Sequence, residues 1–240
     1  RRNFEKTDSA KIIGELSAEK AISRLGAKSI STQKCPVILT PELSVGLFSS
    51  ILSAINGNNI YKKNSFLIDR LGEKIFSDHI NISEIPIVEE GLGTRPFDAE
   101  GVKTYSKQII SDGVLDTYLL DTYSAKQLNL KSTANSGYSN IQIRSSKPMS
   151  ENLIESIDSG VLITEMMGSG ANLLTGDYSR GAFGYLIEKG KISHPVTNFT
   201  IASNMLDMFK NIDEIGCDFY GNSKINCGSV LIKDMTIGGN

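Results

Sequence analysis

The sequence predicts an α+β fold with a mainly antiparallel sheet. Hairpins fill its middle and C-terminal parts, helices lie near the N-terminus, and one helix comes late. Glycine is abundant, with 22 residues, and proline is rare, with 6, a balance that favours many tight turns. The dipeptide Asp112-Gly113 separates two β-like runs, which is a strong hairpin signal. Strands do not alternate with helices and no repeat is present, which argues against a parallel α/β sheet.

The first element is a helix over residues 8–25. Asp8 or Ser9 can cap its N-terminus, and Gly26 ends it. The apolar residues that share one face of this helix are Ala18, Ala21, Ile22 and Leu25. We therefore expect an amphipathic helix at the start of the chain.

A strand at residues 35–40 precedes a stronger helix that begins at Pro41 and ends at Gly57. Its apolar stripe, spaced i, i+3, i+4 and i+7, consists of Phe48, Ile51, Leu52 and Ile55. Residues 72–77 and 80–87 are predicted to be extended.

The middle of the chain predicts a long loop at 91–101 and then the Asp112-Gly113 hairpin. The hairpin strands are residues 103–110 and 114–120. A short helix at 124–130 and a strand at 141–144 follow.

The C-terminal part predicts a short helix at 150–157 and then mostly strands. The strands are residues 161–164, 184–188, 191–196 and 230–237. The turn of the central hairpin is Glu188-Lys189-Gly190-Lys191. Asn204 caps the late helix, whose shared apolar face consists of Met205, Met208, Phe209 and Ile212.

We divide the chain into a helix-rich segment, 1–100, and a sheet-rich domain, 101–240, although the two can also form one continuous domain. The chain opens on Arg1 and Arg2 without a signal peptide. We therefore expect the interior of a longer protein that has a further N-terminal half.

The composition excludes several classes of partner. The net charge is −2, so neither nucleic acid nor an anionic membrane is expected to bind. No apolar run approaches the ~20 residues that span a bilayer. The cysteines Cys35, Cys217 and Cys227 form an odd set without metal-type spacing, which predicts a reducing, cytoplasmic location without disulfides.

Two glycine motifs fail as catalytic or nucleotide-binding signatures. The segment 177–181, Asp-Tyr-Ser-Arg-Gly, lacks the first glycine of a nucleophile elbow, and a strand rather than a helix follows Ser179. The segment 168–173 has Leu173 at the third glycine position of a dinucleotide-binding loop. We interpret it as a glycine-rich turn.

A zinc site is not predicted from this chain alone. His79 and His194 are the only histidines and stand far apart in sequence, and His-Glu-x-x-His is absent. Cys227 is a single thiol, whereas zinc requires three or four converging ligands.

The polar turn Asp177, Tyr178, Ser179 and Arg180 is the candidate binding site. Its four hydrogen-bonding side chains lie between Gly176 and Gly181. They suit an arginine–carboxylate clamp, which either holds the loop in shape or grips a peptide terminus.

Several collinear segments resemble the TldD/PmbA family of metalloproteases and their partner subunits. The matching segments are 95–102, 112–128, 130–135, 175–181, 187–192, 200–208 and 229–239. The form Gly-Asp-Tyr-Ser-Arg-Gly at 176–181 is similar to the PmbA branch, also called TldE. In that branch the His-Glu-x-x-x-His zinc motif of the TldD branch is missing. Cys227-Gly228 resembles the TldD zinc-ligand turn, but Ser229 and Val230 depart from it.

The resemblance implies the C-terminal region of a PmbA-like, non-zinc subunit that pairs with a TldD-like subunit or with itself. The substrates would be small or unfolded peptides, and zinc would lie in the partner or in the further N-terminal half. Two alternatives stay open. In one, the chain is part of an active zinc protease with Cys227 as a ligand; in the other, it is a structural homodimer that binds no peptide.

Overall fold

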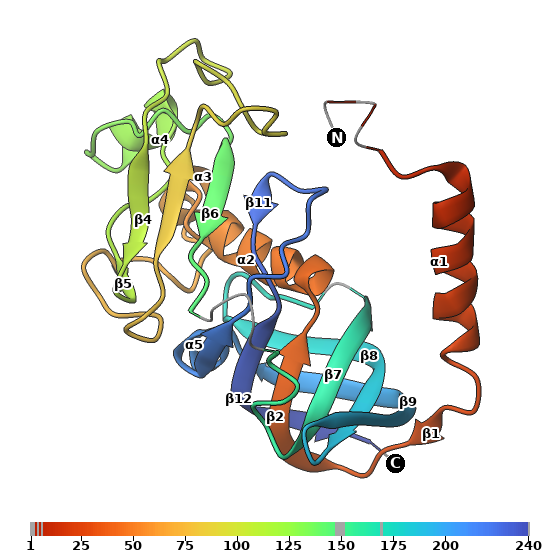
Figure 1. The fold of residues 1–240 in the computed structure, drawn as a ribbon. Helices are drawn as coiled ribbons and strands as arrows, with labels where there is room; N and C mark the ends of the chain where they lie inside the picture. Colours follow the sequence, from red (N-terminus) through yellow and green to blue (C-terminus); the bar gives the residue numbers. More distant parts are fainter. Residues whose placement is uncertain (1–2, 4, 6, 147–151, 169, 240) are drawn as a thin grey trace.

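The α+β fold is confirmed. The computed structural model describes residues 3, 5, 7–146, 152–168 and 170–239. These residues form two sheets, and the long helix α2 (Pro41–Ala54) lies between them (Figure 1). Most strand pairs are antiparallel; the parallel pairs are β1–β9, β2–β7 and β6–β11.

The larger sheet has the order β1-β9-β8-β7-β2-β12-β10. Its strands are β1 (Lys28–Ser29), β2 (Gln33–Leu39), β7 (Ser159–Met167), β8 (Asp177–Glu188), β9 (Lys191–Asn204), β10 (Ile212–Ile215) and β12 (Val230–Gly238). The end of β12 pairs with β2 on one side and with β9 on the other. This second pairing closes β9, β8, β7, β2 and β12 into a circuit, so these strands have no free edge along the closure.

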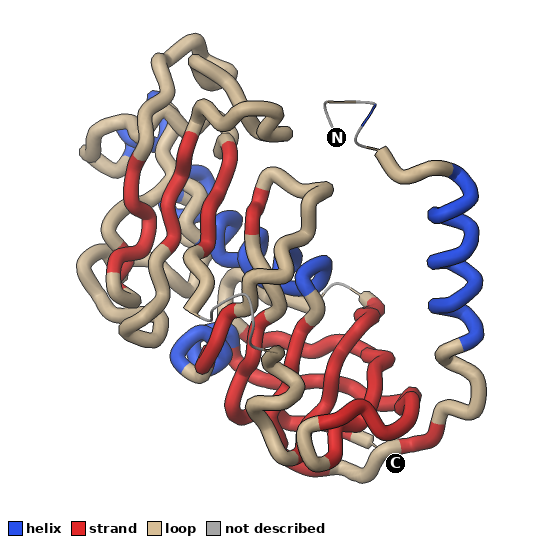
Figure 2. The backbone as a smooth tube through the Cα atoms, viewed as in Figure 1, coloured by secondary structure: helices blue, strands red, loops and turns tan. Residues whose placement is uncertain are grey.

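The smaller sheet has the order β11-β6-β3-β4-β5. Its strands are β3 (Ile82–Ile85), β4 (Lys107–Ser111), β5 (Val114–Leu115), β6 (Asn140–Ile143) and β11 (Ile225–Asn226). Long loops connect these short strands, as the tan segments in Figure 2 show. These loops carry the polar cluster described below.

The other helices of the described residues are α1 (Ala10–Ile22), α3 (Gly57–Tyr61), α4 (Thr122–Gln127) and α5 (Met205–Lys210). The predicted stripe on α2 is confirmed, because Phe48, Ile51, Leu52 and Ile55 are all buried. Phe76 connects this stripe to α5 by stacking on Phe48 and Phe209, with ring centroids 6.3 and 4.5 Å apart. Among the described residues, no helix is both long and apolar enough to cross a membrane.

Helix α1 stands apart from both sheets (Figure 1). Ser9 caps it by accepting the N–H of Ile12 at 3.3 Å, as the sequence predicts. Its residues are not buried, however. Polar contacts hold its C-terminal end: Ser23 lies 2.6 Å from the Tyr185 hydroxyl, Lys20 lies 3.7 Å from Glu42, and Arg24 meets Glu165 at 3.0 Å and lies 4.5 Å from the Phe183 ring. The apolar face predicted for this helix therefore packs against no part of the described chain.

Both predicted hairpin turns are confirmed by their backbone. Asp112 and Gly113 have φ of 47° and 81°, and Lys189 and Gly190 have φ of 52° and 70°. Two successive positive values are the signature of the type I′ turn that matches the twist of paired strands. At Gly113 a Cβ would also lie 2.5 Å from the carbonyl oxygen of Phe76, so only glycine fits.

Some element bounds differ from the predictions, because tertiary hydrogen bonds replace strand pairing. The segment after β5 does not extend the hairpin: Leu119 donates to Ile55 and Leu120 donates to Thr133. Residues 72–77 form turns with one isolated bridge at Lys74 instead of a strand.

Two helix predictions also change. For the predicted helix 150–157, residues 150 and 151 lie outside the described residues, and 153–156 form turns. The late helix is confirmed with Asn204 as its cap, accepting from Leu206 at 3.0 Å. It ends at Lys210, so Ile212 belongs to β10 and not to the helix.

Each sheet contains strands from both sides of residue 100, and one cluster of buried apolar residues includes members of both sheets. That residues 1–100 and 101–240 form separate domains stays a prediction.

Candidate functional site

The predicted polar turn occupies the start of β8, where side chains alternate between the two faces of the sheet. Asp177 and Ser179 are exposed, whereas Tyr178 is buried. The Asp177 carboxylate accepts from the hydroxyl of Thr175 at 2.6 Å. Asp177 and Arg180 fall on opposite faces, and no ion pair joins them in the described part of the chain. The structure therefore does not bring these two residues together.

Arg180 instead shares a face with Tyr178, whose hydroxyl donates to the Met166 sulfur at 3.1 Å. Burial raises the pKa of Tyr178, and the nearby Arg180 charge opposes that shift. The stem of Arg180 covers Gly170, where a Cβ would lie 2.2 Å from Arg180 Cγ. The glycine at 170 thus makes room for an arginine, which gives that turn a packing role.

The remaining metal-ligand candidates lie in separate places. Cys227 is fully buried, its thiol donates to the Gly228 carbonyl at 3.2 Å, and burial raises its pKa well above the usual value. His79 is exposed before β3, and His194 lies in β9, 3.1 Å from the Ser193 hydroxyl. Within the described ranges, no three His, Cys, Asp or Glu side chains gather as metal ligands.

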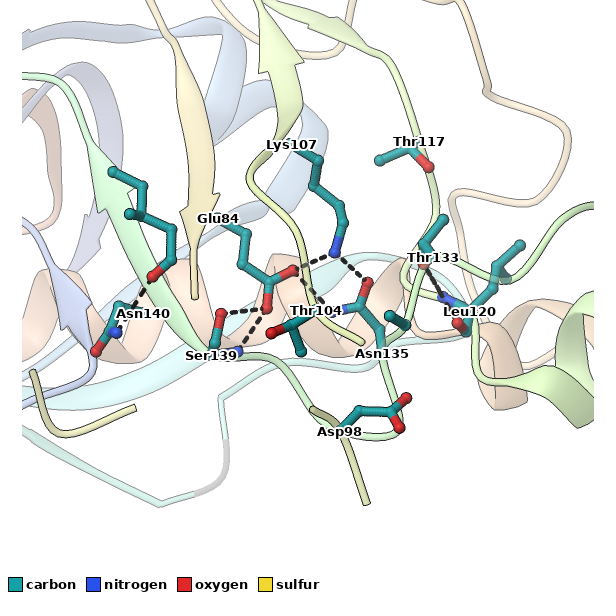
Figure 3. Close-up of polar contacts among 12 residues, drawn as sticks. Glu84, Asp98, Thr104, Lys107, Thr117, Leu120, Thr133, Asn135, Ser139 and Asn140 are labelled. Atoms are coloured by element: carbon teal, nitrogen blue, oxygen red, sulfur yellow. Dashed lines mark hydrogen bonds and ion pairs between the residues drawn. The ribbon is translucent and has the colours of Figure 1, made fainter. Parts of the chain in front are cut away.

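A buried polar cluster joins strands β3 and β4 of the smaller sheet to the loop 131–140 and is drawn in Figure 3. At its centre the Glu84 carboxylate receives the Lys107 ammonium at 2.8 Å, with side chains only 1% and 7% exposed. The amide of Asn135 donates to Glu84 at 2.8 Å, and the N–H and hydroxyl of Ser139 donate at 2.6 Å each. Lys107 also donates to Asn135 at 3.1 Å, so Glu84, Lys107 and Asn135 each have more than one partner. We call these four residues the Glu84 cluster.

The Glu84 cluster keeps its carboxylate ionised. Burial alone would raise the pKa of Glu84, but the hydrogen bonds from Asn135, Lys107 and Ser139 together lower it below the usual value. An ionised acid saturated by donors has no free lone pair for proton transfer. The cluster therefore fixes geometry, tying β3, β4 and the 131–140 loop together.

A second carboxylate holds the neighbouring loop. Asp98 accepts the N–H groups of Glu100, Val102 and Ser136 at 2.9, 3.0 and 3.0 Å. These hydrogen bonds lower the pKa of Asp98 despite its burial. Because Ser136 comes from the other loop, Asp98 joins 91–104 to 131–140.

Asn140 makes a further connection between the same loops. Its side-chain oxygen accepts the N–H of Gly93 at 2.8 Å, and its amide donates to Thr94 Oγ1 at 3.0 Å and to the Ile85 carbonyl at 3.2 Å. At Gly93 a Cβ would lie 2.7 Å from the Ser139 backbone. The loops meet so closely that a glycine is needed between them.

Sequence reasoning did not single out Glu84, Lys107 or Asn135. One signal was available: in a strand that begins with the apolar Ile82, alternation places Glu84 on the same inward face. A charged residue at a core position indicates a buried partner. The sequence does not show which partner this is, however, because Lys107 and Asn135 lie 23 and 51 positions away.

The chain from residue 32 to 239 matches the family model described as the PmbA/TldA metallopeptidase C-terminal domain. The chain belongs to this family. The sequence resemblance to TldD/PmbA proteins is thereby confirmed. The loops 91–104 and 131–140 and strand β8 all lie within the matched region.

Curated relatives in this family are similar over almost the whole chain. The metalloprotease PmbA homolog of Buchnera aphidicola (Acyrthosiphon pisum) is 45% identical over 95% of this chain, and metalloprotease PmbA of Escherichia coli O157:H7 is 43% identical over 95%. The metalloprotease TldD homolog of the same Buchnera is 25% identical over 91%. The chain spans about half the length of these relatives: 52%, 51% and 51%.

Solved structures share the fold of this chain. A putative modulator of DNA gyrase from Bacteroides thetaiotaomicron superposes with a TM-score of 0.90 at 33% identity, covering 95% of this chain and 52% of that one. TldE from Thermococcus kodakarensis superposes with a TM-score of 0.84 at 25% identity, covering 95% and 55%.

Proposed function

We propose that this chain is the C-terminal part of a PmbA/TldE-type subunit of a cytoplasmic metalloprotease that processes small or unfolded peptides. In this proposal a TldD-like subunit holds the zinc, and this chain helps to enclose and hold the peptide. The observation that carries the assignment is the difference in identity, 45% to a PmbA homolog against 25% to the TldD homolog of the same organism.

The state of Cys227 supports the non-zinc assignment over the catalytic alternative. Zinc binds the thiolate, whereas the Cys227 sulfur is buried and its pKa is raised. Recruiting this sulfur to a metal would require the segment between β11 and β12 to move. The chemistry of hydrolysis, a zinc-activated water, would then belong to the partner.

The peptide would contact the exposed side chains of β8. Asp177 and Ser179 face solvent, while Tyr178 and Arg180 pack inward. We therefore assign peptide contact to Asp177 and Ser179, and the role of shaping the loop to Tyr178 and Arg180. Replacing Asp177 with Asn should weaken peptide binding, and replacing Tyr178 with Phe should leave it unchanged.

The proposal is tested by measuring zinc and peptidase activity for this chain alone, for a TldD-like subunit alone, and for the mixture. We expect no zinc with this chain, and peptidase activity that needs both. Stoichiometric zinc on this chain, lost in a Cys227→Ser variant, would favour the catalytic alternative. A stable homodimer without measurable peptide affinity would favour the structural one.

A further inference from the structure

Arg95 projects from a fixed point in the 91–104 loop. Its backbone N–H donates to the Pro86 carbonyl at 3.1 Å, and its carbonyl accepts the Thr104 hydroxyl at 2.8 Å. Neither the PmbA assignment nor the Glu84 cluster uses its side chain.

Two guanidinium nitrogens of Arg95, Nε and Nη2, are buried and have no hydrogen-bond partner in the described part of the chain. Nη2 is the terminal nitrogen remote from Cδ, so its N–H and that of Nε point the same way along one edge. That edge is the fork that binds both oxygens of a carboxylate. Arginine stays protonated in proteins, so these two buried N–H donors keep their need for an acceptor.

The neighbours of Arg95 do not fill this fork. A Cβ added at Gly137 would lie 3.3 Å from Nη2, 3.4 Å from Nη1 and 3.8 Å from Cζ. Gly137 therefore faces the end of the guanidinium between the two Nη atoms, and not the Nε side. Asp98 is close enough for its pKa to respond to Arg95, but its oxygens already accept three backbone N–H groups.

Lys224 supplies a second positive charge nearby. Its ammonium lies 3.8 Å from the centre of the Tyr138 ring and donates to the Tyr138 carbonyl at 3.4 Å. Burial lowers the pKa of Lys224, and the Arg95 charge lowers it further. The two positive charges repel each other, the Glu84 charge offsets part of that effect at Lys224, and an anion between the two cations would relieve the repulsion.

A cavity of about 180 Å³ adjoins Lys224. Asn140, which holds the 91–94 turn, also lines it, together with the apolar side chains Val88, Leu92 and Ile141. Glu90 lies at its exposed rim. The space is small, positively charged on one side and apolar on another, as a terminal peptide residue requires.

We propose that Arg95 and Lys224 form a binding site for the C-terminal carboxylate of a peptide. The Nε–Nη2 fork of Arg95 takes the two oxygens, Lys224 adds its charge, and the apolar wall takes the last side chain. The fork is enclosed in this structure, so entry of a carboxylate requires the residues that cover its Nε–Nη2 edge to move. This inference rests on the proposed function, since it names the part of the peptide that is held.

The test compares N-acetyl-leucine, its amide, and N-acetyl-aspartate α-amide, which carries only a side-chain carboxylate. Binding is followed by the Arg95 Nε–H signal in ¹⁵N NMR spectra of the whole chain. We expect N-acetyl-leucine to move this signal and to bind at least about tenfold more tightly than its amide, a difference of about 1.4 kcal/mol. Arg95→Gln should abolish the preference, Arg95→Lys should lose most of it, and Lys189→Gln should keep it.

Several outcomes would overturn the inference. Equal binding of acid and amide, or an unmoved Arg95 signal, would mean that the fork holds water only. Equal binding of N-acetyl-aspartate α-amide would assign the site to side-chain carboxylates instead. If longer peptides bind but show no preference for a free C-terminus, the proposed function stands and this site fails. If N-acetyl-leucine moves Arg95 while longer peptides do not bind, the site stands and the proposed function fails.

Discussion

Lys107 Nζ lies 2.8 Å from a Glu84 oxygen, and both side chains are almost fully buried. The two residues belong to adjacent antiparallel strands, and Glu84 and Lys107 are register partners. The ion pair is therefore built into the sheet. Through Ser139 it also helps to position the loop 131–140, in which Gly137 lies against Arg95.

Removing one member of this pair should be costly. Lys107→Met leaves the Glu84 carboxylate buried with fewer donors, so we expect a loss of about 3–5 kcal/mol in the free energy of unfolding. Urea denaturation measures it. The matched control is Lys233→Met, which removes a more exposed pair with Asp213 and should cost far less, because solvent screens an exposed ion pair. Equal losses for both variants would show that the buried pair contributes nothing special.

Glu84 should also make stability depend on pH. Its pKa is lowered by folding, so its contribution is fully present above the unfolded value of about 4.3 and disappears as the pH falls through the folded pKa. The stability difference between the wild type and Glu84→Gln should therefore shrink below about pH 4.3. Unfolding curves between pH 3 and 7 measure this difference, and a constant difference over that range would refute the assignment.

Two glycine substitutions should have opposite signs. At Gly184 in β8 a Cβ would lie 2.0 Å from the Leu162 carbonyl oxygen of the neighbouring strand. Gly184→Ala should then destabilise the chain by about 1–3 kcal/mol. At Gly46 in α2 nothing lies within 4 Å of the added atom, so Gly46→Ala should stabilise by up to about 1 kcal/mol. Thermal unfolding of both variants measures these changes in stability. An unchanged stability of Gly184→Ala would contradict the close strand contact.

The three thiols should react at different rates with Ellman's reagent at pH 8. Cys217 is partly exposed and should react first. Cys35 should follow slowly, because burial and then the charge of Asp234 raise its pKa to about 11. Cys227, fully buried, should react only in urea. Fast reaction of Cys227 in the native chain would show that its sulfur becomes accessible, and this would reopen its candidacy as a zinc ligand.

The sequence by itself determined the elements whose signals are local. The stripe Phe48, Ile51, Leu52 and Ile55 specifies α2 because helical periodicity needs no distant partner. Asp112-Gly113 specifies its turn because both residues tolerate positive φ. The seven collinear segments likewise named the family, since a family signature is written in residue order.

Only the tertiary structure decided which polar residues meet. Lys107 and Asn135 lie 23 and 51 positions from Glu84 in the sequence, and no short-range pattern links the three residues. Alternation along β8 places Asp177 and Arg180 on opposite faces, so adjacency in sequence gave no clamp in space. That the two Arg95 nitrogens lack hydrogen-bond partners among the described residues depends on how the chain packs around them. Local sequence specifies backbone conformation, whereas pairing between distant side chains follows from sheet register and loop packing.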